Sequence, residues 1–286
     1  MSVDGIKNVA VLGAGTMGNG IAHVFARAGY RVILRDVEQR FLDRARETIG
    51  KNLDREIKKG KLAEQEKPGV LARIKTATDM AAIAAADFVV EAVPEKLEIK
   101  RAVLTEADRL LRPEVILASN TSSISMTTLA AMTSRPDRFV GMHFMNPVPV
   151  MALVEVIRAL QTSDAAFELT MELAKKLGKT PVAVNDAPGF VSNRVLMPLI
   201  NEAAYCVMEG VATPEAVDAV MKLGMNHPMG PLELADFVGL DVCVDVLKVL
   251  YEGLGDPKYR ACPLLKKYVA AGWLGRKSRR GFYTYG

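Results

Sequence analysis

The sequence contains little cysteine and little histidine. Three residues of each kind occur among 286. Cys206, Cys243 and Cys262 are odd in number and far apart, so they indicate neither a disulfide framework nor a metal site. Such cysteine usage is typical of a reducing compartment, and we expect a cytoplasmic protein. Because histidines are few, side chains that can exchange a proton near neutral pH are few as well.

Long hydrophobic runs and clusters of positive charge are also lacking. No apolar run approaches the ~18 residues of a membrane-spanning helix, and the N-terminus lacks the pattern of a signal peptide. The net charge is +4 and the pI about 8.9, but no stripe of basic and aromatic residues accompanies this charge. We therefore expect neither a membrane nor a nucleic acid as partner. A chain of 286 residues, 50% hydrophobic and 24% charged, is typical of a globular protein with two domains.

The sequence does contain a glycine-rich turn near its N-terminus. An apolar run at 9–12 leads into the pattern G-x-G-x-x-G, and apolar residues then recur at helical spacing. A strand, a tight turn and a helix in this order can bind the pyrophosphate of a dinucleotide at the helix N-terminus. The first glycine permits the turn, the second lets the backbone approach the phosphates, and the third lets the helix pack on the strand. The predicted cofactor-binding residues of this turn are Gly13, Gly15, Thr16, Met17 and Gly18.

Asp36 follows the second predicted strand, at 30–34, and lies 18 residues after Gly18. A carboxylate at this place can accept hydrogen bonds from the hydroxyls of an adenosine ribose. It would repel a 2′-phosphate, although Arg35 is adjacent, so the sequence favours NAD over NADP. The alternative is a glycine turn that binds nothing. The agreement of strand, helix, second strand and terminal acid favours the NAD site.

The rest of the chain falls into two parts. Strands alternate with helices up to Pro188-Gly189, and only helices are predicted after it. This alternation predicts a parallel sheet with helices on both faces. The expected fold is α/β, with a Rossmann-type doubly wound domain at 1–185 and an all-helical domain at 186–286. The predicted strands after the first two are 87–93, 115–118, 139–144, 151–157 and 180–184, and the C-terminal helices are 190–209, 214–223, 232–251 and 264–271.

Polar residues follow two of these strands. Ligands of such sheets bind outside the carboxyl ends of the strands, so Pro94-Glu95 and the polar run at 120–122 are expected beside the cofactor. A polar run after a strand is also a good helix cap. A basic run that includes Lys59 closes a long charged helix at 38–61. Its positive charges interact favourably with the helix dipole at the C-terminus of the helix. They can equally bind a substrate that carries a phosphate.

His143 is the histidine best placed for chemistry. His23 is expected on the surface of the first helix and His227 in a proline-rich loop. His143 precedes a turn, and Glu155 stands on the otherwise apolar strand that follows. A carboxylate there needs a partner, and His143 is within reach across the turn. The pair can be an oriented general base that oxidises an alcohol while a nicotinamide takes the hydride, or it can simply tie two strands together.

Several motifs are longer than generic dinucleotide-binding features. They are Ser119-Asn-Thr-Ser-Ser123, His143-Phe-Met-Asn-Pro-Val-Pro149, Leu153-Val-Glu155, Pro188-Gly-Phe-Val-Ser-Asn-Arg194, Gly230-Pro-Leu-Glu-Leu-Ala-Asp236 and Gly275-Arg-Lys-Ser-Arg-Arg-Gly-Phe-Tyr283. Together with the glycine turn, they resemble the L-3-hydroxyacyl-CoA dehydrogenase family over essentially the full length. The compact chain is most similar to the bacterial 3-hydroxybutyryl-CoA dehydrogenases. The run 278–280 departs mildly from the family pattern, which puts the detail around Lys277 in question.

The resemblance implies roles for individual residues. His143 is implied as the general base and Glu155 as its orienting partner, while Ser122 and Asn193 are implied to hold the 3-oxygen and thioester of the substrate. Lys59 matches the place where the family meets the CoA moiety. The resemblance also implies a homodimer formed through the helical domain, which is expected to form one wall of the substrate cleft. The implied cofactor contacts outside the glycine turn are Glu95, Lys100, Ser122, Asn146 and Lys277.

The reaction implied by the resemblance is the reversible oxidation of a (3S)-3-hydroxyacyl-CoA, such as 3-hydroxybutyryl-CoA, with NAD+ as hydride acceptor. No metal is implied. One alternative is an NAD-dependent sugar-acid dehydrogenase of the gulonate type on the same scaffold. Another is a dinucleotide-binding structural protein without catalysis. The intact set Ser122, His143, Glu155 and Asn193 favours an enzyme.

Overall fold

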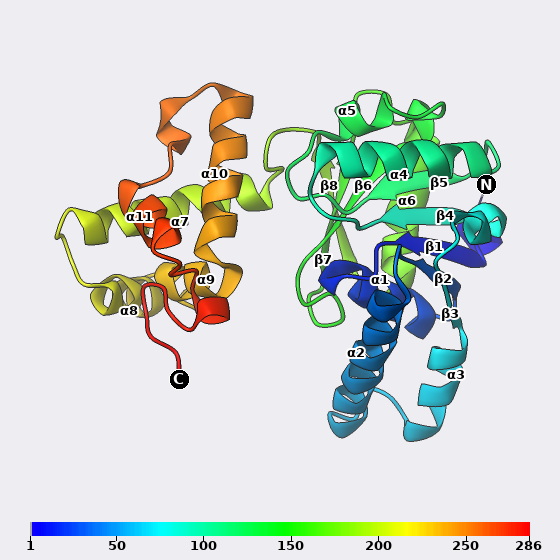
Figure 1. Cartoon of the computed structure of the whole chain (residues 1–286), viewed down its shortest axis with the longest axis horizontal. Coiled ribbons are helices and arrows are strands. Elements are labelled where there is room, and N and C mark those ends of the chain that lie inside the picture. The colour runs from blue at the N-terminus through cyan, green and yellow to red at the C-terminus, as the bar shows by residue number, and fades with distance from the viewer. Residues whose placement is uncertain (1) are drawn as a thin grey trace. The chain divides into compact units, whose positions relative to one another are not determined.

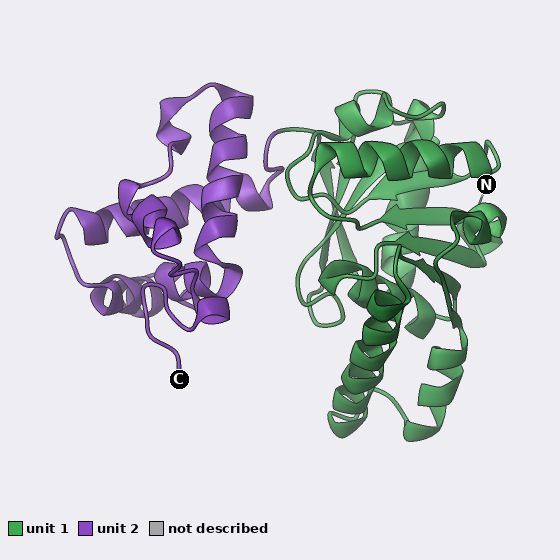
Figure 2. Ribbon diagram, viewed as in Figure 1, with its two compact units in different colours: residues 1–187 green, residues 188–286 purple. Residues whose placement is uncertain are grey.

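The computed structural model describes residues 2–286, which fall into two compact units (Figure 1, Figure 2). Unit 1 extends to Ala187, and unit 2 begins at Pro188. Asp186 belongs to unit 1, because its carboxylate accepts hydrogen bonds from Ser125 Oγ at 2.7 Å and from the Thr127 N–H at 2.8 Å. The sequence pattern instead predicts that the helical domain begins at Asp186. No helix within residues 2–286 is both long enough and apolar enough to cross a membrane.

Within residues 2–286, an eight-stranded sheet forms the centre of unit 1, in the order β3-β2-β1-β4-β5-β6-β7-β8. The inner strands are almost wholly buried, because helices lie on both faces of the sheet (Figure 1). This is the Rossmann-type arrangement, and the predicted fold class is confirmed. The strands are β1 (Asn8–Leu12), β2 (Arg31–Arg35), β3 (Ile74–Ala77), β4 (Phe88–Glu91), β5 (Ile116–Ser119), β6 (Phe139–Phe144), β7 (Leu153–Arg158) and β8 (Thr180–Asn185).

The helices of unit 1 connect these strands. In the first of them Ile21 and Phe25, four residues apart, are fully buried in the main hydrophobic core. Apolar residues at this spacing form one face of a helix, so burial against the sheet stabilises it. The helices are α1 (Thr16–Arg27), α2 (Gln39–Lys58), α3 (Lys67–Ala72), α4 (Leu97–Leu110), α5 (Met126–Ala130) and α6 (Asp164–Lys176).

The sheet is mixed, whereas the sequence analysis predicts a parallel one. Strands β6 and β7 pair antiparallel, with His143 opposite Glu155, and all other neighbours pair parallel. Residues 145–152 connect β6 to β7. A parallel pair needs a crossover of roughly a dozen residues or more, so this short connection permits only the antiparallel arrangement.

Two further elements differ from the predictions. Strand β3 is not predicted, because its four residues include a lysine and a threonine and give little apolar signal. The helix predicted at 232–251 is two helices, which meet at Gly239 with φ of 107°. Only glycine adopts this conformation without strain, so the chain turns there.

Unit 2 is helical and has its own core, which includes Ile200, Leu232 and Leu247. The C-terminal tail is held against it by two buried carboxylates. Asp236 accepts the N–H groups of Phe282 at 3.0 Å and Tyr283 at 2.9 Å, and Asp218 accepts the Tyr283 hydroxyl at 2.7 Å. The helices are α7 (Ser192–Met208), α8 (Pro214–Gly224), α9 (Pro231–Val238), α10 (Leu240–Leu254) and α11 (Pro263–Ala270).

The tail contacts lead to a prediction about stability. Asp236→Ala leaves two backbone N–H groups and the Tyr285 hydroxyl without their acceptor, which costs roughly 1–3 kcal/mol of unfolding free energy. Urea unfolding followed by the fluorescence of Trp273, the only tryptophan, reports on unit 2. The control is Asp245→Ala at an exposed position of α10. Equal unfolding midpoints for the two variants would contradict this account of the tail.

Candidate functional site

The turn between β1 and α1 requires its glycines. Gly13 has φ of 101°, and a Cβ on it would lie 2.6 Å from the carbonyl oxygen of Ala92. A Cβ on Gly18 would overlap the carbonyl of Gly13, so the third glycine lets α1 approach the turn. A Cβ on Gly15 would meet nothing within 4 Å, so this backbone faces open space. The turn is thus closed on the sheet side and open where a pyrophosphate would approach.

Asp36 lies at the edge of a cavity of about 580 Å³ beside this turn. Its Oδ2 accepts the N–H of Ala14 at 2.6 Å and its Oδ1 that of Val37 at 2.7 Å. Each oxygen has a second lone pair, which can accept a hydroxyl of a ribose. Most of the other lining side chains are apolar and suit the flat face of an adenine, and Arg35 also lines the cavity. The described residues therefore fit NAD; the lining includes Gly13, Gly15, Thr16, Met17, Asp36, Ala92, Val93 and Ile99.

A second cavity, of about 450 Å³, lies between α1, α2 and the turn after β6. Asn146 lines it together with Gly15 and Thr16, so the predicted nicotinamide-side residue shares a cavity with the glycine turn. Arg44 and Asn52 of α2 also line this cavity and provide donors for a polar or anionic ligand.

His143 and Glu155 face each other across β6 and β7. His143 Nδ1 lies 2.8 Å from Glu155 Oε2, and the two residues are 5% and 2% exposed. An ionised carboxylate can only accept, so Nδ1 carries the proton in this pair and Nε2 is left as the basic nitrogen. The strand register therefore decides the tautomer of the imidazole.

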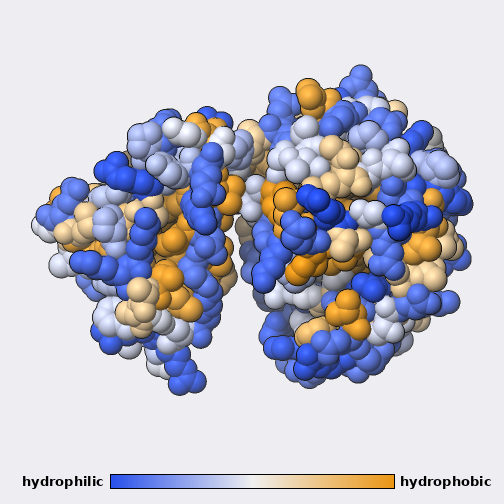
Figure 3. Space-filling view, turned by 45° about the horizontal axis from the view of Figure 1, so that its top comes forward, coloured by the Kyte–Doolittle hydropathy of each residue, from blue (hydrophilic) through white to orange (hydrophobic). Residues whose placement is uncertain are grey.

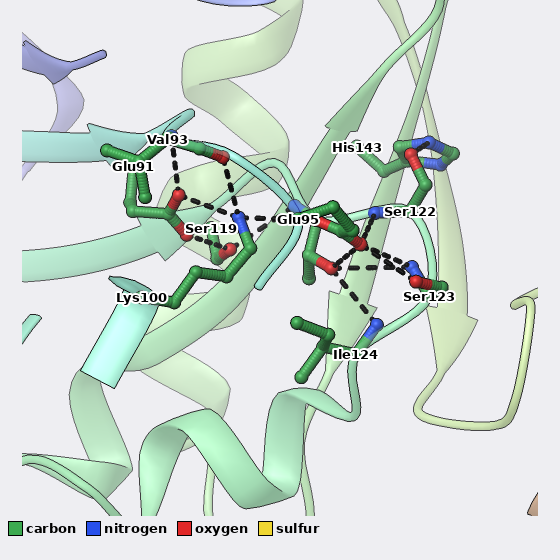
Figure 4. Close-up of polar contacts among 10 residues, drawn as sticks. Glu91, Val93, Glu95, Lys100, Ser119, Ser122, Ser123, Ile124 and His143 are labelled. Atoms are coloured by element: carbon green, nitrogen blue, oxygen red, sulfur yellow. Dashed lines mark hydrogen bonds and ion pairs between the residues drawn. The ribbon is translucent and has the colours of Figure 1, made fainter. Parts of the chain in front are cut away.

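Ser122 lies on the other side of the imidazole, where its Oγ is 3.0 Å from His143 Nε2 (Figure 4). The hydroxyl comes from the loop after β5, and the histidine from the neighbouring strand β6. Three of the predicted residues, Ser122, His143 and Glu155, thus form a chain of polar contacts through the imidazole. A nitrogen held in this way can take a proton from an alcohol that binds beside the serine.

Glu95 organises the loop that carries Ser122. Its Oε1 accepts the N–H groups of Ser122 at 3.0 Å and Ser123 at 3.1 Å, and also the hydroxyls of Thr121 and Ser123. Burial acts to raise the pKa of Glu95, but the charge of Lys100 and the hydroxyl hydrogen bonds outweigh it. The pKa of this carboxyl therefore lies below its usual value, and the loop is bound to a carboxylate (Figure 4).

Lys100 joins Glu95 to a residue that the sequence analysis does not name. Its Nζ lies 2.7 Å from Glu91 Oε1 and 3.3 Å from Glu95 Oε2. Glu91 ends β4, and its Oε2 accepts the hydroxyl of Ser119 at 2.6 Å. A carboxylate on an otherwise apolar strand is the signal that singles out Glu155, and the same signal could have identified Glu91 at the end of β4.

Three predicted residues remain, one in unit 1 and two in unit 2. Lys59 is the exposed C-cap of α2. In unit 2, Asn193 belongs to the first turn of α7, and Lys277 forms an ion pair of 2.5 Å with Asp241. Their roles toward cofactor and substrate stay predictions. Within residues 2–286 no cluster of histidine, cysteine and acidic side chains could hold a metal ion.

His23 is not on the surface, so that prediction is wrong. Its side chain is fully buried, and its Nε2 lies 3.2 Å from Glu56 Oε1. The helical pattern suggested an outward face, but α2 packs against that side of α1 and buries the imidazole.

Comparisons with known proteins agree with this site. Residues 8–187 match the NAD-binding domain of 3-hydroxyacyl-CoA dehydrogenase, and residues 189–285 match the C-terminal domain of the same enzyme. The chain belongs to the 3-hydroxyacyl-CoA dehydrogenase family. It is accordingly an NAD-dependent oxidoreductase, and the resemblance inferred from the motifs is confirmed.

The dehydrogenase is similar to bacterial relatives over its full length. It is 55% identical to 3-hydroxybutyryl-CoA dehydrogenase of Bradyrhizobium diazoefficiens, covering 98% of this chain and 96% of the relative. It is 46% identical to that of Clostridioides difficile, covering 97% and 99%. The crystal structure of (S)-3-hydroxybutyryl-CoA dehydrogenase PaaH1 from Ralstonia eutropha superposes with a TM-score of 0.95 at 52% identity, covering 98% and 99%.

The lowered pKa of Glu95 predicts a pH dependence of the dehydrogenase's stability. A carboxyl with a depressed folded-state pKa stabilises the fold above its unfolded pKa and loses this contribution as the pH falls through the folded value. The ordinary pKa of a glutamate is 4.5. Below this pH we expect the unfolding free energy of Glu95→Gln to fall less steeply than that of the unaltered chain. Urea unfolding at pH values of about 3.5, 4.5 and 5.5 measures this slope.

The matched control is Glu106→Gln, on the exposed face of α4. For Glu106→Gln, the unfolding free energy should depend on pH as steeply as it does for the unaltered chain. Parallel pH profiles for Glu95→Gln and the unaltered chain would show that Glu95 is not stabilised as a carboxylate.

Proposed function

We propose that the dehydrogenase oxidises (3S)-3-hydroxybutyryl-CoA, or a similar short-chain thioester, reversibly to the 3-oxoacyl-CoA. The observation that carries the proposal is the His143 imidazole, held between the Ser122 hydroxyl and the Glu155 carboxylate. The names of the full-length relatives support this substrate. The cavity that contains Asn146, Arg44 and Asn52 offers polar groups for the CoA portion.

His143 acts as the general base in this proposal. Glu155 holds the proton on Nδ1 and stabilises the imidazolium that forms when Nε2 takes the hydroxyl proton. Because both side chains are almost fully buried, this charge pair is screened little by water. Ser122 orients the substrate oxygen beside Nε2, and Asn193 is proposed to bind the substrate as well. The bound NAD+ supplies the acceptor for the hydride.

The cofactor is proposed to bind along the β1–α1 turn. Backbone N–H groups at the start of α1 would meet the pyrophosphate, and Asp36 would accept the ribose hydroxyls. Because the carboxylate of Asp36 would repel a 2′-phosphate, NAD is preferred to NADP. Glu95, Lys100 and Lys277 are proposed to lie on the cofactor side, and Lys59 is proposed to meet the CoA.

A direct assay tests the proposal. The purified protein is given 3-hydroxybutyryl-CoA with NAD+, and acetoacetyl-CoA with NADH for the reverse direction. We expect turnover with both thioesters and far slower reaction with free 3-hydroxybutyrate and with sugar acids. Faster turnover of a free sugar acid would favour the gulonate-type alternative. Failure to turn over any of these compounds would leave a dinucleotide-binding protein without catalysis.

The His143→Asn variant tests the general base. It should lower kcat roughly 10²–10⁴-fold, the usual contribution of a positioned acid–base group, and leave the Kd for NAD+ unchanged. His227→Asn in unit 2 is the control and should keep the unaltered kcat. A near-normal kcat for His143→Asn would end the assignment of this residue as the base.

We also propose a cytoplasmic homodimer formed through unit 2. The three cysteines are thiols in the structure, which suits a reducing compartment. Hydrophobic side chains reach the surface of unit 2 (Figure 3). Burial of such side chains in a dimer would remove apolar area from water. The most exposed of them on and beside α8 are Val211, Val220, Leu223 and Met225.

A charge at the centre of this surface should dissociate the dimer. Leu223, on α8, is 88% exposed. Leu223→Asp would place a carboxylate where the proposal buries an apolar side chain, so we expect the mass from light scattering to shift from dimer to monomer. The control is Leu160→Asp, in unit 1, where the side chain is 87% exposed. A dimer that survives Leu223→Asp and dissociates with Leu160→Asp would place the interface in unit 1.

A further inference from the structure

Glu91 and Lys100 form an ion pair that is completely withdrawn from water. The two side chains are 0% and 1% exposed, and Nζ lies 2.7 Å from Oε1. Glu91 ends β4 between two neighbours, opposite Leu12 of β1 and Ser119 of β5. Burying two charges is costly unless every donor and acceptor is matched, and Glu91 Oε1 accepts the N–H of Val93 at 2.7 Å in addition to the ammonium.

Lys100 provides the first branch of these contacts. Its ammonium has three N–H donors and three acceptors around it: Glu91 Oε1 at 2.7 Å, the Val93 carbonyl at 3.2 Å and Glu95 Oε2 at 3.3 Å. Glu91 therefore fixes the cation, and the cation holds one oxygen of Glu95. The other oxygen of Glu95 accepts the N–H groups of Ser122 and Ser123.

Ser119 provides the second branch. It donates its hydroxyl to Glu91 Oε2 at 2.6 Å and accepts the N–H of Thr121 at 3.2 Å. Both branches end in the same short loop, at residues 119–123 (Figure 4). This loop presents the Ser122 hydroxyl at 3.0 Å from His143 Nε2.

We propose that Glu91 is a positioning residue for the reaction, and that it sets the distance between Ser122 and His143. It acts through Lys100 and Glu95 on one side and through Ser119 on the other, and no step of the chemistry requires it to touch the substrate. The inference rests on the proposed function, because the Ser122–His143 geometry matters only if this pair handles the substrate hydroxyl.

A second buried ion pair of unit 1 serves as a matched comparison. Arg135 Nε lies 2.6 Å from Asp108 Oδ1, and both side chains are nearly buried. The Arg135 guanidinium donates to the carbonyls of Asp108 and Leu111, at the end of α4. This pair thus stabilises the same unit without a hydrogen-bonded path, among the described contacts, to the loop at 119–123.

The test compares Glu91→Gln with Asp108→Asn. Both variants neutralise the acid of a buried pair and keep its size, so both should lower the Tm. We expect Glu91→Gln alone to reduce kcat with 3-hydroxybutyryl-CoA by about 10- to 100-fold, the cost of misplacing a reacting group by a fraction of an ångström to one ångström. The KM for the thioester should change little, because no residue proposed to bind the thioester is altered. Since Lys100 and Glu95 are proposed cofactor-side residues, kcat is compared at saturating NAD+ for every variant.

A second measurement does not depend on activity. Hydrogen exchange of the peptide that covers residues 119–124 reports on the N–H groups that Glu95 and Ser119 hold. We expect exchange in this peptide to become at least about tenfold faster in Glu91→Gln and to stay unchanged in Asp108→Asn. If the unaltered chain fails to turn over the thioester, the proposed function fails, while the exchange comparison still tests the inference.

A double variant covers the case in which Glu91→Gln alone does not fold. Glu91→Gln/Lys100→Gln removes both charges of the fully buried pair and leaves only the partly exposed Glu95 without its cation, so its Tm should recover towards that of the unaltered chain. The positioning role predicts that kcat stays low and exchange at 119–124 stays fast, because Glu95 has lost its cation. Recovery of kcat together with Tm, or an equal loss of kcat in Asp108→Asn, would overturn the proposal and leave Glu91 a purely structural residue.

Discussion

The register between β6 and β7 is the constraint on which the site depends. Glu155 stands on a strand whose residues Val154 and Val156 are fully buried, and Glu155 itself is only 2% exposed, so its carboxylate needs a partner within the protein. The antiparallel register sets it opposite His143. A slip of one residue would turn the carboxylate to the opposite face of the sheet and leave both groups without this partner. The packing of the two strands therefore determines the orientation of the imidazole and its tautomer, and with the tautomer which ring nitrogen is basic.

Three acids share this edge of the sheet, and each is used differently. Glu155 holds an imidazole, Glu95 holds a loop through its N–H groups, and Glu91 holds a lysine and a serine. In each case a carboxylate is matched by donors held in place by the fold of unit 1, because they belong to strands of the sheet, to the loop after β5 and, for Lys100, to α4. Charge-assisted hydrogen bonds of this kind are strong and directional, and they give the site a defined geometry before any ligand binds.

In unit 2, buried carboxylates are likewise matched by hydrogen-bond donors, at residues for which no catalytic role is proposed. Asp218 accepts the N–H groups of Leu232 and Glu233 at the start of α9, and Asp236 accepts those of the C-terminal tail. Gly281 packs directly against Asp236, where any side chain would overlap the carboxylate. The motifs around these residues, which carry part of the family resemblance, are thus explained by packing and by the need to pair buried N–H groups.

The sequence alone determined the glycine turn, the acid that follows the second strand, the order of the two domains and the family. These depend on local spacing, turn chemistry and apolar periodicity, all of which are visible along the chain. It also singled out His143 and Glu155, because a carboxylate on an apolar strand needs a partner close by. The tertiary structure decided the mixed sheet, the burial of His23, and the contacts of Ser122 and Glu91. These contacts join residues that lie 9–28 positions apart, and they exist only once strand order and register have brought the segments together.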